Sequence, residues 1–163
     1  MKVLVAAASR HGATQEIADA IGRTLDAEGV HASVTPIAEA GDPTGYDAVI
    51  LGSAVYMGHW LDAATKFVES RGAALSARPT WLFSSGPIGD PPRPSESEAV
   101  DVDDLVSKTH AKGHKLFAGK LDKGKLGFGE RAVMLAFHAA EGDYRNWQEI
   151  ETWARAIARE LQH

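Results

Sequence analysis

Cysteine is missing from the sequence altogether. Its absence excludes disulfides, zinc–thiolate sites, iron–sulfur clusters and catalysis by a thiolate. Basic residues are outnumbered as well, with 17 Lys and Arg against 22 Asp and Glu and a formal charge of −5. This balance argues against nucleic acid as a partner, because a duplex-binding surface is basic. A mildly acidic chain suits docking on a basic redox partner, although many ordinary proteins have the same composition.

Long apolar runs are also missing, and none is long enough to cross a bilayer. The first run ends at Ala8, before Ser9-Arg10-His11, and is too short to be the core of a signal peptide. We therefore expect a buried strand here, a cytoplasmic location and no stable insertion into a membrane.

What the sequence does contain is an alternation of apolar runs with segments of helical periodicity. This pattern predicts a single α/β domain, 1–163, with a five-stranded, doubly wound parallel sheet and helices on both faces. The expected strands are Val3–Ala8, His31–Ile37, Asp47–Ser53, Thr80–Ser84 and Lys115–Leu121. The expected helices are Thr14–Glu28, Trp60–Leu75, Val102–Lys108, Glu130–His138 and Trp147–Leu161.

Ligands of such a sheet bind at the carboxyl ends of the strands, where the winding reverses. The segments after the first, third and fourth strands are therefore the candidate site. A cluster of prolines at 87–94 predicts that residues 86–98 form a long exposed loop.

The segment after the first strand has the residues of a phosphate-binding turn. It reads Ser9, Arg10, His11, Gly12, Ala13 and Thr14. Backbone N–H groups, two hydroxyls and a helix N-terminus can hold a phosphate without a lysine. An ordinary helix entry, with Thr14 as N-cap, explains the same residues without a ligand. Neither G-x-G-x-x-G nor G-x-x-x-x-G-K-[ST] occurs at this position.

The segments after the third and fourth strands could flank a planar ring. Tyr56 and Trp60 are candidates for stacking, with Met57 filling a gap and Gly58 allowing close backbone approach. Alternatively, Trp60 is buried beneath the helix that follows. The fourth strand leads into Ser85-Gly86-Pro87-Ile88, whose polar groups could bind a ring edge.

Two histidines, His110 and His114, have the spacing of metal ligands on a helix. Gly113 lies between them and no carboxylate partner is near, so we interpret the segment as a solvated turn and expect no metal site.

Taken together, the three segments resemble the flavodoxin family. Ser9–Thr14 is similar to its phosphate loop, with His11 where a threonine is usual, and Met57-Gly58 resembles its second flavin loop. The stretches SRHGATQEIA, GSAVYMGHW and GDYRNWQEIETWARAIA resemble the branch that contains menaquinone-dependent protoporphyrinogen oxidase. The likeness covers nearly the whole chain and implies a sheet order of 2-1-3-4-5.

The resemblance implies flavin mononucleotide (FMN) as cofactor. The residues that it places at the cofactor are Ser9, Arg10, His11, Gly12, Ala13, Thr14, Ala54, Val55, Tyr56, Met57, Gly58, Ser85, Gly86, Pro87 and Ile88. One departure concerns Asp122–Asp143, which is shorter and poorer in aromatics than the equivalent insertion of the oxidase.

Three functions remain open on this basis. The first is an electron-transfer protein that exchanges electrons with a reductase and an acceptor protein, with no catalytic side chain of its own. The second is an FMN-dependent oxidoreductase of the protoporphyrinogen oxidase or quinone reductase type. The third is a binding module that has kept the fold without the cofactor.

Overall fold

A computed structural model describes residues 1–56, 58–86, 102–121, 142–143 and 145–163 of the chain. Met57, Pro87 and Ile88 of the expected site lie outside this part, as do most of the expected loop 86–98 and the expected helix Glu130–His138.

The centre of the molecule is a sheet of parallel strands in the order β2-β1-β3-β5-β6. The strands are β1 (Lys2–Ala8), β2 (His31–Pro36), β3 (Ala48–Tyr56), β5 (Thr80–Ser85) and β6 (Gly113–Phe117). The remaining member, β4 (His59–Trp60), is a short strand that pairs antiparallel with the end of β3. Counting the parallel strands alone, the order is 2-1-3-4-5, so the predicted doubly wound sheet is confirmed.

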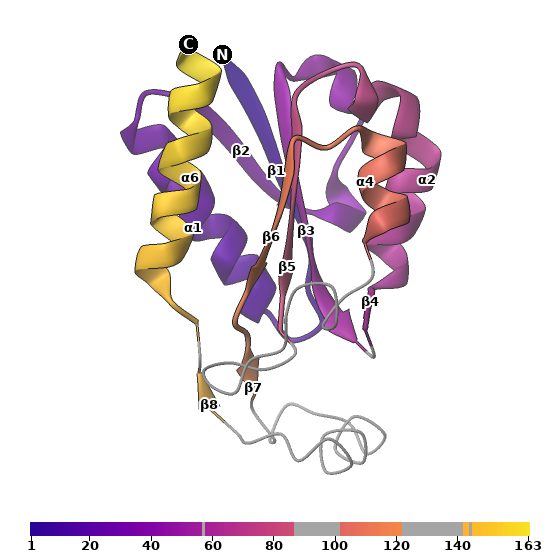
Figure 1. Cartoon of the computed structure of the whole chain (residues 1–163), viewed down its shortest axis with the longest axis vertical. Helices are drawn as coiled ribbons and strands as arrows, with labels where there is room; N and C mark the ends of the chain where they lie inside the picture. The colour runs from indigo at the N-terminus through magenta and orange to yellow at the C-terminus, as the bar shows by residue number, and fades with distance from the viewer. Residues whose placement is uncertain (57, 87–101, 122–141, 144) are drawn as a thin grey trace.

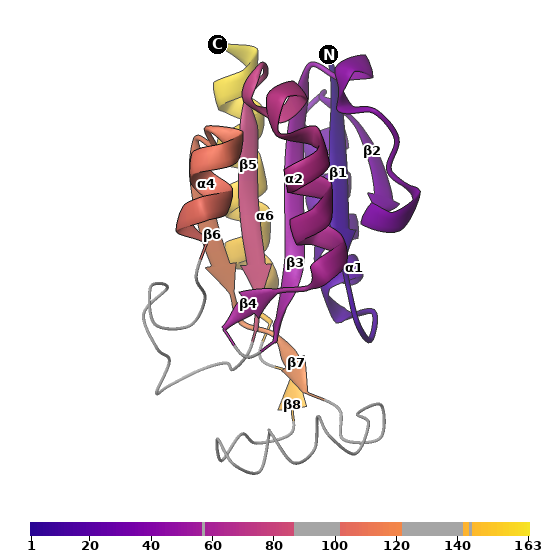
Figure 2. The same cartoon turned by 90° about the vertical axis from the view of Figure 1, so that its right-hand side faces the viewer.

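Helices cover the two faces of this sheet (Figures 1 and 2). One face is covered by α1 (Ala13–Ala27) and α6 (Trp147–Gln162), which pack against each other. The other face is covered by α2 (Asp62–Ser76) and the shorter α4 (Asp103–Thr109). Two 3₁₀ turns, Ile37–Glu39 and Pro43–Gly45, join β2 to β3. None of the helices in the described ranges combines the length and the apolar character that crossing a membrane requires.

The core is divided by the sheet into two layers, because successive side chains of a strand point to opposite faces. In β1, Val3 and Val5 pack toward α1 and α6, whereas Leu4 and Ala6 pack toward α2. All four are at most 1% exposed. The unbroken apolar run at the start of the chain is thus the pattern of a strand that is buried on both faces.

A glycine in β3 makes room for an aromatic cluster under α6. A Cβ added at Gly52 would lie 2.0 Å from the ring of Phe83 on the neighbouring strand. The ring of Phe83 lies 6.1 Å from those of both Phe117 and Trp153, measured between centroids. The absent side chain of Gly52 therefore lets three aromatic rings pack over the centre of the sheet.

Several predicted boundaries were wrong near the carboxyl edge of the sheet. β3 continues to Tyr56 because β4 folds back on it, which provides backbone partners beyond the parallel ladder. For the same reason α2 begins at Asp62 and not at Trp60. The last predicted strand is divided: β6 ends at Phe117, and β7 (Lys120–Leu121) pairs instead with β8 (Gly142–Asp143) in a separate two-stranded sheet.

Candidate functional site

Three turns meet at the carboxyl edge of the sheet, at the lower end of the view in Figure 1. They follow β1, β3 and β5, as expected from the doubly wound topology. Each contains a glycine with a left-handed backbone, Gly12 (φ 92°), Gly58 (φ 81°) or Gly86 (φ 86°). Within the part of the chain that the structure describes, no atom would lie within 4 Å of a Cβ added at any of the three. The backbone therefore turns sharply at three adjacent points and leaves open space in front of each.

The first turn leaves the N-terminus of α1 without a side-chain cap. Gly12 occupies the N-cap position, and its own N–H donates to Oγ of Ser9 at 2.9 Å. Thr14 is the second residue of the helix, so the interpretation of Thr14 as N-cap is wrong. The N–H groups of the first helical turn lack intrahelical partners and carry the positive end of the helix dipole. They are therefore available to an anion.

Thr14 adds a hydroxyl to this turn. Its residue is only 2% exposed, yet among the described residues no hydrogen-bond partner is found for the hydroxyl. No side-chain nitrogen or oxygen of the described residues is both fully buried and without a partner, so the Thr14 hydroxyl keeps some access to solvent and can donate to a ligand. The backbone N–H groups and the Thr14 hydroxyl thus form a set of hydrogen-bond donors that a small anion such as phosphate fits.

An arginine and a tyrosine connect the first turn with the second. The guanidinium carbon of Arg10 lies 4.7 Å from the centroid of the Tyr56 ring. Arg10 is exposed and Tyr56 is half-buried, so the pair lies at the surface near the carboxyl edge of the sheet. Ala54 and Val55 precede Tyr56 in β3 and are also half-buried. Of the residues expected at the site, Arg10 and Tyr56 are therefore in contact.

The second turn is held by hydrogen bonds to a buried serine. Tyr56 pairs with His59 across the β3–β4 hairpin, and Gly58 lies in the turn between them. Oγ of Ser53 accepts the N–H of Leu61 at 3.0 Å and donates to the carbonyl of Ala54 at 2.8 Å. One completely buried side chain therefore fixes both ends of the hairpin.

Trp60 is part of the core and does not form a stacking surface. It is 4% exposed, and its indole N–H donates to Oγ of Ser84 at 2.7 Å. The alternative interpretation, a tryptophan buried beneath the helix that follows, is correct. Because its indole is buried in the core, Trp60 cannot stack on a planar ring bound at the surface of the carboxyl edge.

Oγ of Ser84 also lies 2.7 Å from Nε2 of His114, which belongs to the edge strand β6. The interpretation of His114 as part of a solvated turn is therefore wrong. His110 is exposed and ends α4 in a left-handed conformation (φ 52°). The two histidines lie on different elements, so their spacing of four does not represent one helical face.

The third turn is held by β6 and the residues that follow this strand. The N–H of Gly86 donates to the carbonyl of Phe117 at 3.0 Å, and a Cβ added at Gly119 would lie 2.9 Å from Cα of Gly86. Ser85 is 5% exposed. Of the expected residues in this turn, the backbone of Gly86 faces open space, while Ser85 lies largely beneath it.

The sequence analysis did not assign Arg145 and Trp147 to the site, although Arg145 contacts the first turn and Trp147 contacts Arg145. Arg145 donates to the carbonyl of Ala13 at 3.3 Å and to Oε1 of Glu16 at 3.0 Å. Its guanidinium carbon lies 4.6 Å from the centroid of the Trp147 ring. Glu16 and Arg145 are 129 positions apart, so no local pattern relates them. The only signal was the stretch GDYRNWQEIETWARAIA, in which both Arg145 and Trp147 occur.

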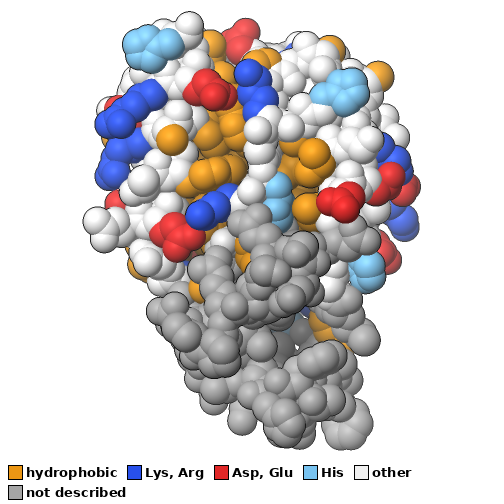
Figure 3. All heavy atoms as spheres, viewed as in Figure 1, with side chains coloured by type: hydrophobic (Ala, Val, Ile, Leu, Met, Phe, Trp, Pro, Cys, Tyr) orange, Lys and Arg blue, Asp and Glu red, His pale blue; other side chains and the backbone are white. Residues whose placement is uncertain are grey.

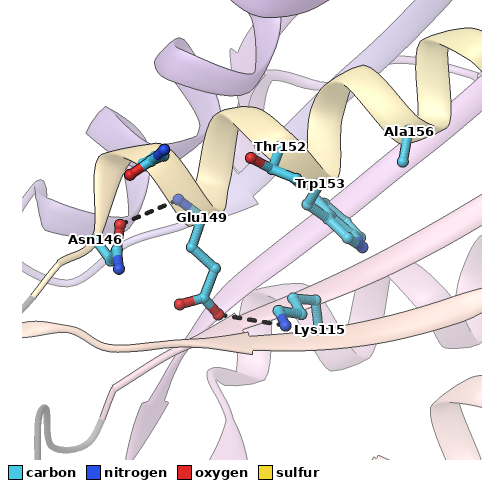
Figure 4. A pocket seen from close by; sticks show the side chains of 7 residues that line it. Lys115, Asn146, Glu149, Thr152, Trp153 and Ala156 are labelled. Carbon is cyan, nitrogen blue, oxygen red and sulfur yellow. Dashed lines mark hydrogen bonds and ion pairs between the residues drawn. The ribbon is translucent and has the colours of Figure 1, made fainter.

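A second hollow lies between α6 and β6 (Figure 4). It is an open groove over the indole of Trp153, crossed by an ion pair of 3.3 Å between Lys115 and Glu149. Figure 3, in the same view as Figure 1, shows hydrophobic side chains exposed on either side of β6, toward α6 and toward α4. Lys115 and Glu149 thus pair with each other in this groove, and the three glycine turns lie elsewhere.

Comparisons with known proteins agree with this geometry. The family model described as "Flavodoxin domain" matches residues 4–146. Protoporphyrinogen IX dehydrogenase [quinone] of Escherichia coli K12 is 24% identical over 97% of this chain and 95% of its own length. An archaeal flavodoxin structure superposes with a TM-score of 0.68 at 16% identity, covering both chains completely. Oxidised flavodoxin 1 from Bacillus cereus has a TM-score of 0.63 at 17% identity, covering 98% of each chain.

A doubly wound parallel sheet with three turns at its switch point defines a protein of the flavodoxin-like class. The match of the family model over most of the sequence identifies the group within this class. The chain belongs to the flavodoxin domain family.

Proposed function

We propose that the protein binds FMN in the crevice formed by the three turns and transfers electrons through it. The observation that carries the proposal is the first turn, an uncapped helix N-terminus beside the hydroxyl of Thr14, for which the described residues supply no hydrogen-bond partner. Such a turn fits a phosphate dianion without a lysine. Membership of the flavodoxin domain family supports the same ligand.

In this proposal each turn has its own part in holding the cofactor. Ser9, Arg10, His11, Gly12, Ala13 and Thr14 form the phosphate site. Ala54, Val55, Tyr56, Met57 and Gly58 lie against one side of the flavin ring, and Ser85, Gly86, Pro87 and Ile88 lie on the other. The bound flavin supplies the redox chemistry, while the protein orients it and limits the access of water. We assign no catalytic side chain.

The proposal places a single domain, 1–163, in the cytoplasm, where it exchanges electrons with a reductase and an acceptor protein. A second candidate function is favoured by one comparison. The Escherichia coli relative, similar over 97% of this chain, is a protoporphyrinogen IX dehydrogenase [quinone]. The corresponding reaction here is the FMN-dependent oxidation of a porphyrinogen with a quinone as acceptor.

Titration of the purified apoprotein with FMN and with riboflavin tests the proposal. We expect FMN to bind much more tightly, because only FMN carries the phosphate for which the first turn is built. Failure of both flavins to bind would contradict the proposal and favour a cofactor-free module. Equal affinities would contradict the assignment of the phosphate site.

The two redox functions differ in what they need for turnover. The electron-transfer protein needs a partner protein, whereas the oxidoreductase turns over with a porphyrinogen and a quinone alone. The FMN-loaded protein is mixed with a porphyrinogen and a quinone, without a partner protein, and the absorbance of the porphyrin product is followed. An increase indicates the oxidoreductase, whereas no increase indicates the electron-transfer protein.

A further inference from the structure

A nearly buried arginine from the far end of the chain contacts the first turn. Arg145 precedes Asn146, the N-cap of α6, and the N-terminal end of this helix lies beside that of α1 at the same end of the molecule (Figure 1). Its Nη1 donates to the carbonyl of Ala13, the first residue of α1, at 3.3 Å. Its side chain is only 4% exposed. The positive charge is thus fixed within one helical turn of the proposed phosphate site.

The same guanidinium binds an acidic residue in that helical turn. Nη1 of Arg145 lies 3.0 Å from Oε1 of Glu16, whose N–H forms the first helical hydrogen bond, to Gly12. A carboxylate in the first turn stabilises a helix through its dipole, but it also repels any anion bound at the same end. Glu16 therefore opposes a phosphate dianion unless its charge is compensated.

The guanidinium is nearly buried, whereas the side chain of Glu16 is 56% exposed. Trp147 lies over the guanidinium at 4.6 Å from its ring centroid to Cζ, and removes it from water on that side. Charges interact more strongly where water is excluded, and they are less screened by salt. Arg145 is held in place by its contacts with Ala13, Glu16 and Trp147 and is not a mobile surface cation.

We propose that Arg145 is a positioning residue for the phosphate turn, which neutralises Glu16 and so allows a doubly charged phosphate to bind at the N-terminus of α1. The proposal rests on the proposed function, since it requires FMN as ligand. It assigns a role to the GDYRNWQEIETWARAIA stretch, which contributes no residue to the three turns themselves.

The test is a charge cycle at positions 16 and 145, with dissociation constants of FMN and riboflavin measured at low ionic strength. Arg145→Gln should weaken FMN about tenfold, equivalent to ~1.4 kcal/mol, and leave riboflavin unchanged. Glu16→Gln alone should tighten FMN about threefold, because it removes the repulsive charge. The double variant Glu16→Gln with Arg145→Gln should return FMN affinity to within about threefold of the parent.

Two further variants separate the charge from other roles. Arg145→Lys keeps the charge, and we expect it to retain most of the FMN affinity. Arg155→Gln is the matched control, because Arg155 lies on α6 and pairs with Glu28 and Glu151, away from the turn. It should change neither dissociation constant. Thermal denaturation of each apoprotein shows whether the variant is folded.

A merely structural role for Arg145 gives a different pattern. Equal losses of FMN and riboflavin affinity, or no recovery in the double variant, would overturn the proposal. If Arg145→Gln does not fold, Glu16→Gln decides the question, and unchanged FMN affinity in that variant also overturns it. If the parent binds neither flavin, the proposed function itself has failed. If the parent binds FMN but neither Arg145→Gln nor Glu16→Gln changes FMN affinity selectively over riboflavin, only the role of Arg145 is refuted.

Discussion

Trp60 and Ser84 connect the second turn of the crevice to the strand that carries the third. The indole N–H of Trp60 donates to Oγ of Ser84 at 2.7 Å, in a position where both residues are buried. The hydroxyl is also 2.7 Å from Nε2 of His114. Three elements that are not adjacent in the sequence, β4, β5 and β6, are thereby joined at one point.

We expect the Trp60–Ser84 bond to contribute measurably to stability. Trp60→Phe should lower the free energy of unfolding by about 1–3 kcal/mol, from the lost hydrogen bond and the smaller ring. Ser84→Ala should cost a similar amount, because it leaves the indole N–H unpaired. Denaturation in urea gives both values. In the double variant the cost should be smaller than the sum of the two; additive costs would show that the bond contributes nothing. Trp147→Phe, at a position 38% exposed, is the control and should have little effect.

Thr14 tests the phosphate turn directly. Thr14→Val should weaken FMN about tenfold, because one hydrogen bond to a charged group is lost, and should not change riboflavin affinity. The apoprotein should be no less stable, since the hydroxyl has no partner among the described residues.

The control for this substitution lies in the same helix. Thr24→Val removes a hydroxyl that donates to the carbonyl of Ala20 at 2.9 Å, and it should leave both affinities unchanged. A loss of riboflavin binding in Thr14→Val as large as the loss of FMN binding would place the phosphate elsewhere. Fluorescence quenching of each flavin provides the measurement.

Substitution of Tyr56 should affect the two flavins equally, in contrast to substitution of Thr14. Tyr56→Leu removes a ring that we expect to lie against the flavin, and should weaken FMN and riboflavin equally, by about 3- to 10-fold. Tyr46→Leu is the matched control, because Tyr46 also lies under a cation, with Nζ of Lys2 at 5.4 Å from its ring, but at the other end of β3. Loss of FMN affinity alone in Tyr56→Leu would be inconsistent with contact to the ring.

The absence of a side chain at Gly119 should be required for the position of the third turn. In Gly119→Ala the new Cβ would lie 2.9 Å from Cα and 3.0 Å from N of Gly86, and neither backbone atom can move without displacing the turn. We expect a loss of about 1–3 kcal/mol in stability, as for other overpacked sites, together with weaker binding of both flavins.

Gly41→Ala is the corresponding control. No atom lies within 4 Å of the added Cβ at Gly41, so stability should stay the same or rise by up to about 1 kcal/mol. Chemical denaturation and flavin titration of the two variants provide the comparison. If Gly119→Ala behaves like Gly41→Ala, the contact between Gly119 and Gly86 does not hold the turn.

The sequence predicted well those features that depend on neighbouring residues. The apolar run Val3–Ala8 could be interpreted as a strand buried on both faces because its burial depends on side chains that follow one another. Gly12 could be placed at a turn because glycine, unlike residues with a Cβ, adopts a left-handed backbone without steric cost. The order of the sheet followed from the alternation of strands and helices together with the resemblance to the flavodoxin family.

Predictions were weaker where the chain folds back on itself. The short strand β4 moved the start of α2 from Trp60 to Asp62, and it placed Trp60 in the core. A two-residue strand has no periodicity of its own, so it is defined only by pairing with β3. The division of the last strand into β6 and β7 has the same origin, since β7 pairs with β8 and not with the main sheet.

By itself, the sequence determined the class of fold and the three segments that turn at the carboxyl edge of the sheet, because strand periodicity and glycine turns are local properties. Only the tertiary structure decided which side chains support those segments. Arg145 reaches Glu16 across 129 positions, and His114 reaches Ser84 across 30. Such pairs depend on the packing of α6 against α1 and of β6 against β5. The free energy of each pair is gained only after those elements have packed, so no sequence pattern of fixed spacing corresponds to it.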